Sequence, residues 1–238
     1  MATLEQAFGE LLAASPAQPF VTYYDEASGE RSELSVKSLA NWVAKTHFLL
    51  IDELGLGAGD TAYVALPMHW ISVPVLIGSL TAGLTLSDEP QNAVVAFVAP
   101  DTAASAAGIA DVFAVAPQPA AVGFGDQPPE GTVDYVRAVR PQADKWTGVQ
   151  FGAGESDLAL AGVTRAQLVE SARQRAAELD LPGSARILST RTWQRAADWL
   201  DALFVPLAVG GSVVYVANAS DEAVLDRRAD QERVTARA

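Results

Sequence analysis

The sequence predicts an α/β protein built on a mainly parallel sheet with helices on both faces. Short apolar segments without charge alternate with helix-like segments, which is typical of strands buried between two helical layers. Half of the 238 residues are hydrophobic, enough to bury a sizeable core. No internal repeat and no long linker interrupts this order. We therefore expect one α/β domain over residues 1–220 and a charged C-terminal tail over residues 221–238.

The N-terminal segment is expected to contain a helix, a hairpin and a longer helix. Apolar residues recur at helical spacing over residues 3–14. Two short strands over 20–24 and 31–34 flank a turn rich in Asp, Glu, Ser and Gly, which is typical of a β-hairpin. Ser35 is placed to cap a long helix that runs to about Leu54, where a glycine-rich segment ends it.

Beyond residue 60, strands and helices are expected to alternate. The residues Thr164-Arg-Ala-Gln167 form a capping-box sequence, which predicts the start of a helix there. Residues 117–130 are rich in Pro and Gly and are expected to form a loop. The expected strands are 61–66, 94–98, 112–116, 157–160, 186–189 and 212–216, and the expected helices are 69–82, 102–110, 132–140, 164–179 and 195–208.

The distribution of charge argues against several classes of function. The chain has 16 basic and 29 acidic residues and a net charge of −13, so it lacks the basic surface that nucleic-acid binding needs. Residues 46–136 contain ten acidic residues and no Lys or Arg, so a phosphate bound there would depend on backbone amides. The absence of Cys excludes disulfides and thiolate sites, and with two His residues a zinc site is not expected.

A long uncharged segment over residues 61–87 has the length of a membrane span. Pro67 and Pro74 interrupt it, His69 lies inside it, and no basic residue flanks it. We interpret it as a buried strand followed by a buried helix. The N-terminus lacks the basic and apolar regions of a signal peptide. We expect no membrane span and a cytoplasmic location.

Few residues are candidates for a site. His69 follows an expected strand at its carboxyl end, the edge at which ligands bind in open α/β sheets, although a structural histidine is the commoner case. Trp193 precedes an expected helix and is either packed in the core or stacked on a ligand. His47 is interpreted as a packed or partly exposed helical side chain and Asp88-Glu89 as a surface turn. Neither the P-loop pattern GxxxxGKS/T nor the nucleophile-elbow pattern GxSxG occurs.

Several short motifs occur in a defined order along the chain. They are Pro19–Asp25 with Gly29-Glu-Arg31, Gly55-Leu-Gly-Ala-Gly-Asp60, Val64-Ala-Leu-Pro67, Gly78-Ser-Leu-Thr-Ala-Gly83, Thr164–Leu168 and Pro206–Val214. This order resembles the N-terminal part of adenylate-forming enzymes, the acyl/aryl-CoA synthetase or AMP-binding superfamily. The resemblance extends to Thr235, nearly the whole chain. It implies the fold of the N-terminal subdomains of acetyl-CoA synthetase-like enzymes.

The resemblance also implies which functional residues are missing. In the superfamily, a Ser/Thr/Gly-rich loop ending in Pro-Lys wraps the ATP phosphates before the helix that starts here at Thr164. This sequence has Glu155 and Asp157 in that segment and no lysine after Lys145, and Thr81 stands where a motif lysine is expected. The later superfamily motifs, which bind ribose, adenine and magnesium and supply a C-terminal lysine, have no counterpart in these 238 residues. We expect no catalytic residue, no cofactor and no metal ligand.

Three hypotheses follow for the function. The first is a non-catalytic relative with a structural, interaction or regulatory role, exposing an apolar patch for self-association or a protein partner. The second is a module that binds a small acyl or aryl carboxylate or a CoA ester. The resemblance implies that the segment after residues 186–189 lines an acyl pocket, so Thr192 and Trp193 are candidate ligand-binding residues beside His69. The third is one half of a split acyl ligase that needs a partner chain.

Overall fold

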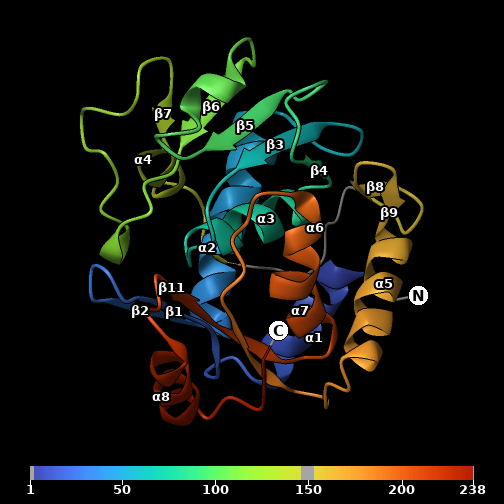
Figure 1. Ribbon diagram of the computed structural model, residues 1–238. Coiled ribbons are helices and arrows are strands. Elements are labelled where there is room, and N and C mark those ends of the chain that lie inside the picture. Colours follow the sequence, from blue (N-terminus) through green and yellow to red (C-terminus); the bar gives the residue numbers. More distant parts are fainter. Residues whose placement is uncertain (1–2, 146–152, 238) are drawn as a thin grey trace.

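The strands form two sheets that share one hydrophobic core (Figure 1). The computed structural model describes residues 3–145 and 153–237. The first sheet has the order β12-β10-β11-β1-β2, and the second has the order β7-β6-β5-β3-β4-β8-β9. The strands of the first sheet are β1 (Pro19–Asp25), β2 (Glu30–Ser35), β10 (Arg186–Ser189), β11 (Ser212–Ala217) and β12 (Ala236–Arg237); those of the second are β3 (Thr61–Ala65), β4 (Thr85–Ser87), β5 (Val95–Val98), β6 (Asp111–Ala114), β7 (Val133–Asp134), β8 (Leu158–Leu160) and β9 (Val163–Thr164).

Parallel pairing dominates both sheets. In the first sheet β11 pairs in parallel with β1 and β10, and β2 joins β1 as an antiparallel edge strand. In the second sheet β3 pairs in parallel with β4 and β5, and β8 and β9 form an antiparallel pair at one edge. The carboxyl ends of β1, β10 and β11 therefore lie at one edge of the first sheet, and those of β3, β4 and β5 at one edge of the second.

Helices α2 and α3 lie between the two sheets, and α3 is buried along its whole length (Figure 1). An uncharged, apolar helix is suited to this position because it presents no side chain that needs water. The predicted caps are present: the Ser35 hydroxyl accepts from Ser38 N, and Thr164 and Gln167 form the capping box. The helices are α1 (Leu4–Ala14), α2 (Val36–Phe48), α3 (Ser72–Thr81), α4 (Tyr135–Val139), α5 (Arg165–Glu178), α6 (Ala196–Trp199), α7 (Val205–Ala208) and α8 (Glu222–Glu232), with π-helical turns η1 (Leu49–Glu53) and η4 (Leu200–Phe204) and 3-10 turns η2 (Ala103–Ala106) and η3 (Pro119–Ala121).

The α/β class with mainly parallel pairing is confirmed, but two features differ from the sequence-based expectation. The strands divide between two sheets instead of one. The expected helix over 102–110 is only the turn η2, because Ala106 is the one residue of that turn that is buried and Gly108 has a positive φ of 91°. A helix needs an apolar face to dock, and this alanine-rich segment does not provide one.

The C-terminal segment that was expected to be a charged tail contains α8 and β12 (Figure 1). Glu232 accepts a hydrogen bond of 2.5 Å from the Tyr24 hydroxyl and one of 2.6 Å from Arg186, and Arg228 pairs with Glu26 at 2.6 Å. These contacts hold α8 against the first sheet. The division of the chain at residue 220 stays a prediction.

One buried ion pair ties the helices together. Arg165, at the start of α5, contacts the carboxylate of Glu5 in α1, and both side chains are at most 2% exposed. The same guanidinium donates to the carbonyl oxygens of Leu80 at 2.9 Å and Leu84 at 3.1 Å, at the end of α3.

In the described part of the chain, no helix has the length and apolar character needed to cross a membrane.

Candidate functional site

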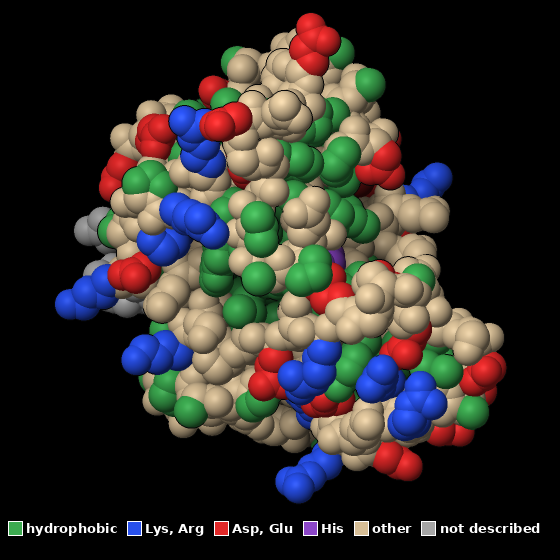
Figure 2. Space-filling view, turned by 90° about the vertical axis from the view of Figure 1, so that its left-hand side faces the viewer, with side chains coloured by type: hydrophobic (Ala, Val, Ile, Leu, Met, Phe, Trp, Pro, Cys, Tyr) green, Lys and Arg blue, Asp and Glu red, His purple; other side chains and the backbone are tan. Residues whose placement is uncertain are grey.

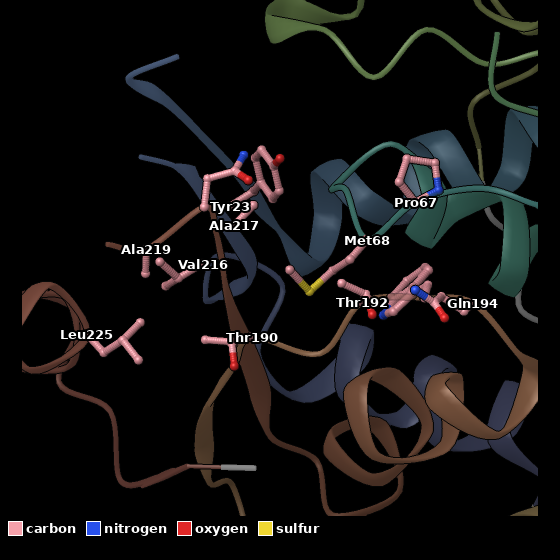
Figure 3. A pocket seen from close by; sticks show the side chains of 12 residues that line it. Tyr23, Pro67, Met68, Thr190, Thr192, Gln194, Val216, Ala217, Ala219 and Leu225 are labelled. Atoms are coloured by element: carbon pink, nitrogen blue, oxygen red, sulfur yellow. The ribbon is translucent and has the colours of Figure 1, made fainter. Parts of the chain in front are cut away.

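The carboxyl ends of the two sheets meet at a groove with two compartments. The first compartment has a volume of about 620 Å³ and is lined by Tyr23 of β1, Ala217 at the end of β11, Thr190 after β10, Met68 after β3 and Leu225 of α8. Figure 3 shows these side chains arranged around the space. Its walls are mainly apolar, so it suits an apolar or aromatic group.

The second compartment, of about 360 Å³, lies at the carboxyl edge of the second sheet. Its lining includes the end of β3, Asp88 after β4, and Asp101 and Thr102 after β5. Pro67, Trp193 and Gln194 line both compartments. We call the two compartments together the carboxyl-edge groove.

Hydrogen bonds hold the walls of the groove in place. The Thr102 hydroxyl donates to the Ala65 carbonyl at 2.7 Å and accepts from Ala99 N at 2.9 Å, which fastens the loop after β5 to the end of β3. The Asp88 carboxylate accepts from Ala196 N at 2.9 Å, so the end of β4 is joined to the start of α6. These walls come from segments far apart in the sequence.

Trp193 forms the wall between the two compartments. Its side chain is only 6% exposed, and its ring meets that of Tyr215 edge to face, with centroids 5.6 Å apart. Its indole N–H has no hydrogen-bond partner among the described residues. Thr192 is exposed and lines the first compartment. The core and ligand-facing readings of Trp193 are therefore compatible, and a ligand-binding role for Thr192 and Trp193 stays a prediction.

His69 lies close to the groove, but it does not line either compartment. It is 1% exposed, its Nε2 is 3.4 Å from Oε1 of Glu30, and its ring lies edge-on to Tyr23 with centroids 4.5 Å apart. Its Nδ1 accepts from Ile71 N at 3.3 Å. Burial lowers the pKa of His69, and the nearby carboxylate of Glu30 opposes this effect. His69 thus packs against Tyr23, a residue of the first compartment, and a direct role of His69 in binding stays a prediction.

Acidification below pH 6.5 is expected to destabilise the fold, because burial lowers the pKa of both His47 and His69 from their usual value of 6.5. The unfolded chain then binds protons that the folded chain does not bind, so the free energy of unfolding falls as the pH falls. Each histidine contributes at most about 1.4 kcal/mol per pH unit. Urea unfolding at about pH 7 and about pH 5.5 measures the loss, which should be smaller in His69→Gln. Equal losses in the two proteins would contradict this account.

The turn before α5, where the resemblance places a phosphate loop, is closed by its own side chains. The Asp157 carboxylate accepts from Gly154 N at 2.6 Å. The first amides of α5 are also engaged: Ala166 N donates to the Glu155 carbonyl at 3.0 Å, and Gln167 N donates to the Thr164 hydroxyl at 3.2 Å. An anion would have to displace these acceptors, including a carboxylate. Phe151 and Gly152 of this segment lie outside the described residues.

Among the described residues that line the groove, none carries a positive charge that could hold a phosphate. Neither compartment has a Lys or Arg among its described lining residues, and the second has the carboxylates of Asp88 and Asp101. Over residues 3–145 and 153–237, no cluster of three or more His, Asp and Glu side chains could hold a metal ion.

Of the described lining residues, sequence reasoning proposed only Thr192 and Trp193. Among those that it missed are Met68, Asp88, Asp101 and Leu225. Asp88 was interpreted as part of a surface turn, yet it lines the second compartment. The position of Asp101 shortly after the expected strand 94–98 was a usable signal, because that edge is where ligands bind in such sheets. Asp88 follows β4, a strand that was not among those expected. Nothing in the sequence places Leu225, since its helix reaches the groove only through long-range packing.

Comparisons with known proteins agree with this architecture. No family model matches the sequence. A "TIGR03089 family protein" of Mycobacterium tuberculosis (strain ATCC 25618 / H37Rv) is 39% identical over 233 residues, which cover 94% of this chain and 93% of the relative.

Three solved structures share the fold. Acetoacetyl-CoA synthetase from Streptomyces lividans has a TM-score of 0.80 at 17% identity, with 99% of this chain and 42% of that chain covered. An acyl-CoA synthetase of Brucella canis has a TM-score of 0.78 at 16% identity, with 99% and 47% covered. The anthranilate CoA ligase AuaEII in complex with anthranoyl-AMP has a TM-score of 0.76 at 13% identity, with 99% and 49% covered. The chain therefore spans less than half the length of these structures and has the fold of the N-terminal region of acyl-CoA synthetases.

Proposed function

Because the chain belongs to the TIGR03089 family and has the fold of the N-terminal region of acyl-CoA synthetases, we propose that it is a non-catalytic protein that binds a small acyl or aryl compound in the carboxyl-edge groove. The observation that carries this proposal is the first compartment, an apolar cavity of about 620 Å³ bounded by Trp193, Tyr23 and Met68. Aromatic walls of this kind contribute large apolar contact area to a bound ring or chain.

We propose no adenylation activity because of the charged groups at the two places where the phosphates of ATP could bind. ATP needs donors and cations around its phosphates. Here the Gly154 amide is already bound by the Asp157 carboxylate, and the described lining of the groove has carboxylates and no Lys or Arg. These features oppose a bound triphosphate at both places.

A ligand screen tests the proposal. The screen contains four classes of compound: aryl acids, their methyl esters, fatty acids and acyl-CoAs. At least one of these classes is expected to raise the Tm of the protein. At about ten times Kd the expected rise is about 3–6 °C. ATP with Mg²⁺ is expected to leave Tm unchanged.

A matched pair of variants locates the binding. Ala219→Trp fills the first compartment and should abolish the stabilisation, whereas Ala223→Trp adds the same side chain at an exposed position of α8 and should preserve it. No response to any acyl or aryl class would sink the binding proposal. Carboxylate-dependent pyrophosphate exchange with ATP, alone or with a second chain, would instead support a split acyl ligase.

An interaction role is a second candidate, favoured by one view of the surface. Figure 2 shows hydrophobic side chains gathered in the middle of one face, with charged side chains mainly around them. Such a patch is suited to self-association or to a protein partner. Sedimentation velocity over a wide concentration range tests self-association. A strict monomer at every concentration would exclude self-association and leave binding to a different protein as the interaction role.

A further inference from the structure

We propose that the compound held in the carboxyl-edge groove has a positively charged amine at its polar end, in the compartment lined by Asp88 and Asp101. This inference rests on the proposed function, and it narrows the ligand class from acyl or aryl compounds in general to apolar or aromatic amines.

The charge of the second compartment is unbalanced. Asp88 and Asp101 are the only ionisable acids in its described lining, and no Lys, Arg or His lies among those residues. Neither carboxylate forms an ion pair in the described part of the chain, and the one hydrogen bond to Asp88 comes from the neutral amide of Ala196. Asp88 is half-buried and Asp101 is exposed, and two such carboxylates without a counter-charge favour a cation and oppose an anion.

The remaining walls suit the same ligand. Tyr63, Trp193 and Trp199 line this compartment, and aromatic faces attract ammonium groups as well as apolar ones. The buried indole N–H of Trp193 lacks a partner among the described residues. Because this nitrogen has less than 1 Å² of exposed surface, an acceptor on the ligand would pair with it only if the ring turned towards the groove.

The two compartments are neighbours, because Pro67, Trp193 and Gln194 border each of them, and in this proposal one molecule extends across both. The apolar body then lies among Met68, Val216 and Leu225 in the first compartment. The amine lies beyond Trp193, towards the ends of β4 and β5. A carboxylate or phosphate in that position would be repelled.

Three indoles that differ only in the end group test this charge preference. Tryptamine, tryptophol and indole-3-propionate each have two carbons between the ring and an ammonium, a hydroxyl or a carboxylate. In calorimetric titrations at neutral pH and low salt, tryptamine is expected to bind about tenfold more tightly than tryptophol, and indole-3-propionate more weakly than either. Added salt should reduce the advantage of tryptamine.

Variants assign the preference to the two carboxylates. Asp101→Asn and Asp88→Asn should each weaken tryptamine binding about threefold to tenfold and leave tryptophol binding unchanged. The asparagine oxygen at position 88 can still accept from Ala196 N, and unchanged tryptophol binding shows that the variant is folded. Asp111→Asn is the matched control, because Asp111 begins β6 and lies outside the lining of the groove.

Equal affinity for the three indoles, or tryptamine binding that is unchanged in both variants, would overturn the amine assignment and leave the proposed function intact. A response in the acyl and aryl screen without any indole binding would also overturn it. Failure of both the indoles and the screen would instead contradict the proposed function itself.

Discussion

Replacement of Arg165 by methionine is expected to lower the free energy of unfolding by about 3–5 kcal/mol, the largest loss that we expect from a single substitution in this chain. The variant leaves the Glu5 carboxylate, whose side chain is 2% exposed, without its cation. It also removes the donors to the carbonyl oxygens of Leu80 and Leu84. An uncompensated charge would then be buried where α1, α3 and α5 meet. The Leu84 carbonyl would lose its donor, whereas the Leu80 carbonyl still accepts from Gly83 N at 3.0 Å.

The charge state of Arg165 supports this reasoning. Burial lowers its pKa to about 10, which still leaves the guanidinium charged at neutral pH. The pair is therefore ionic in the folded protein, and loss of one partner costs more than loss of both.

Urea unfolding followed by tryptophan fluorescence measures the effect. The double variant Glu5→Leu with Arg165→Met should recover part of the stability, because no buried charge remains, although the Leu84 carbonyl still lacks the donor that Arg165 supplied. If the free energy of unfolding of Arg165→Met lies within about 1 kcal/mol of that of the parent protein, water or a rearranged carboxylate must replace the guanidinium.

Alanine at Gly78 is expected to destabilise the protein by about 1–3 kcal/mol, through contact of α3 with α2. A Cβ at this position would lie 2.5 Å from Cβ of Thr46 and 3.2 Å from the carbonyl oxygen of Val43. Thr46 is not free to move aside, because its hydroxyl bonds the Trp42 carbonyl at 2.9 Å and the Tyr135 hydroxyl at 2.7 Å. The two helices would have to separate.

Gly9→Ala is the matched control, since Gly9 also lies inside a helix and a Cβ there meets nothing within 4 Å. Alanine should stabilise α1 by about 0.5–1 kcal/mol, because glycine is the poorer helix former. The two substitutions are therefore expected to have opposite signs. A stabilising effect of Gly78→Ala in the same unfolding assay would mean that α2 and α3 adjust without cost.

Local signals in the sequence predicted local structure well. The capping box at Thr164 and Gln167 and the cap at Ser35 are present, because each depends on residues within three positions of one another. The α/β class was predicted in the same way, because each strand or helix in the alternating order is indicated by a short local pattern. The resemblance to acyl-CoA synthetases is matched by the fold.

Long-range features could not be read in this way. The pairing of β1 with β11 and the bond between Asp88 and Ala196 join segments that no local pattern connects. The division into two sheets and the second compartment of the groove both depend on such contacts. Trp193 was identified as a candidate, but only the fold shows that one buried ring lines both compartments.

The parallel pairing of β1 with β11 also has a consequence for synthesis on the ribosome. Val21 pairs with Val213, so one side of an apolar strand is synthesised long before the partner strand that covers it. Until then only the antiparallel partner β2 protects β1, and its other edge offers free amide and carbonyl groups to any extended chain nearby. Until β11 has been made, the growing chain thus depends on other contacts or on a chaperone to shield β1 from aggregation.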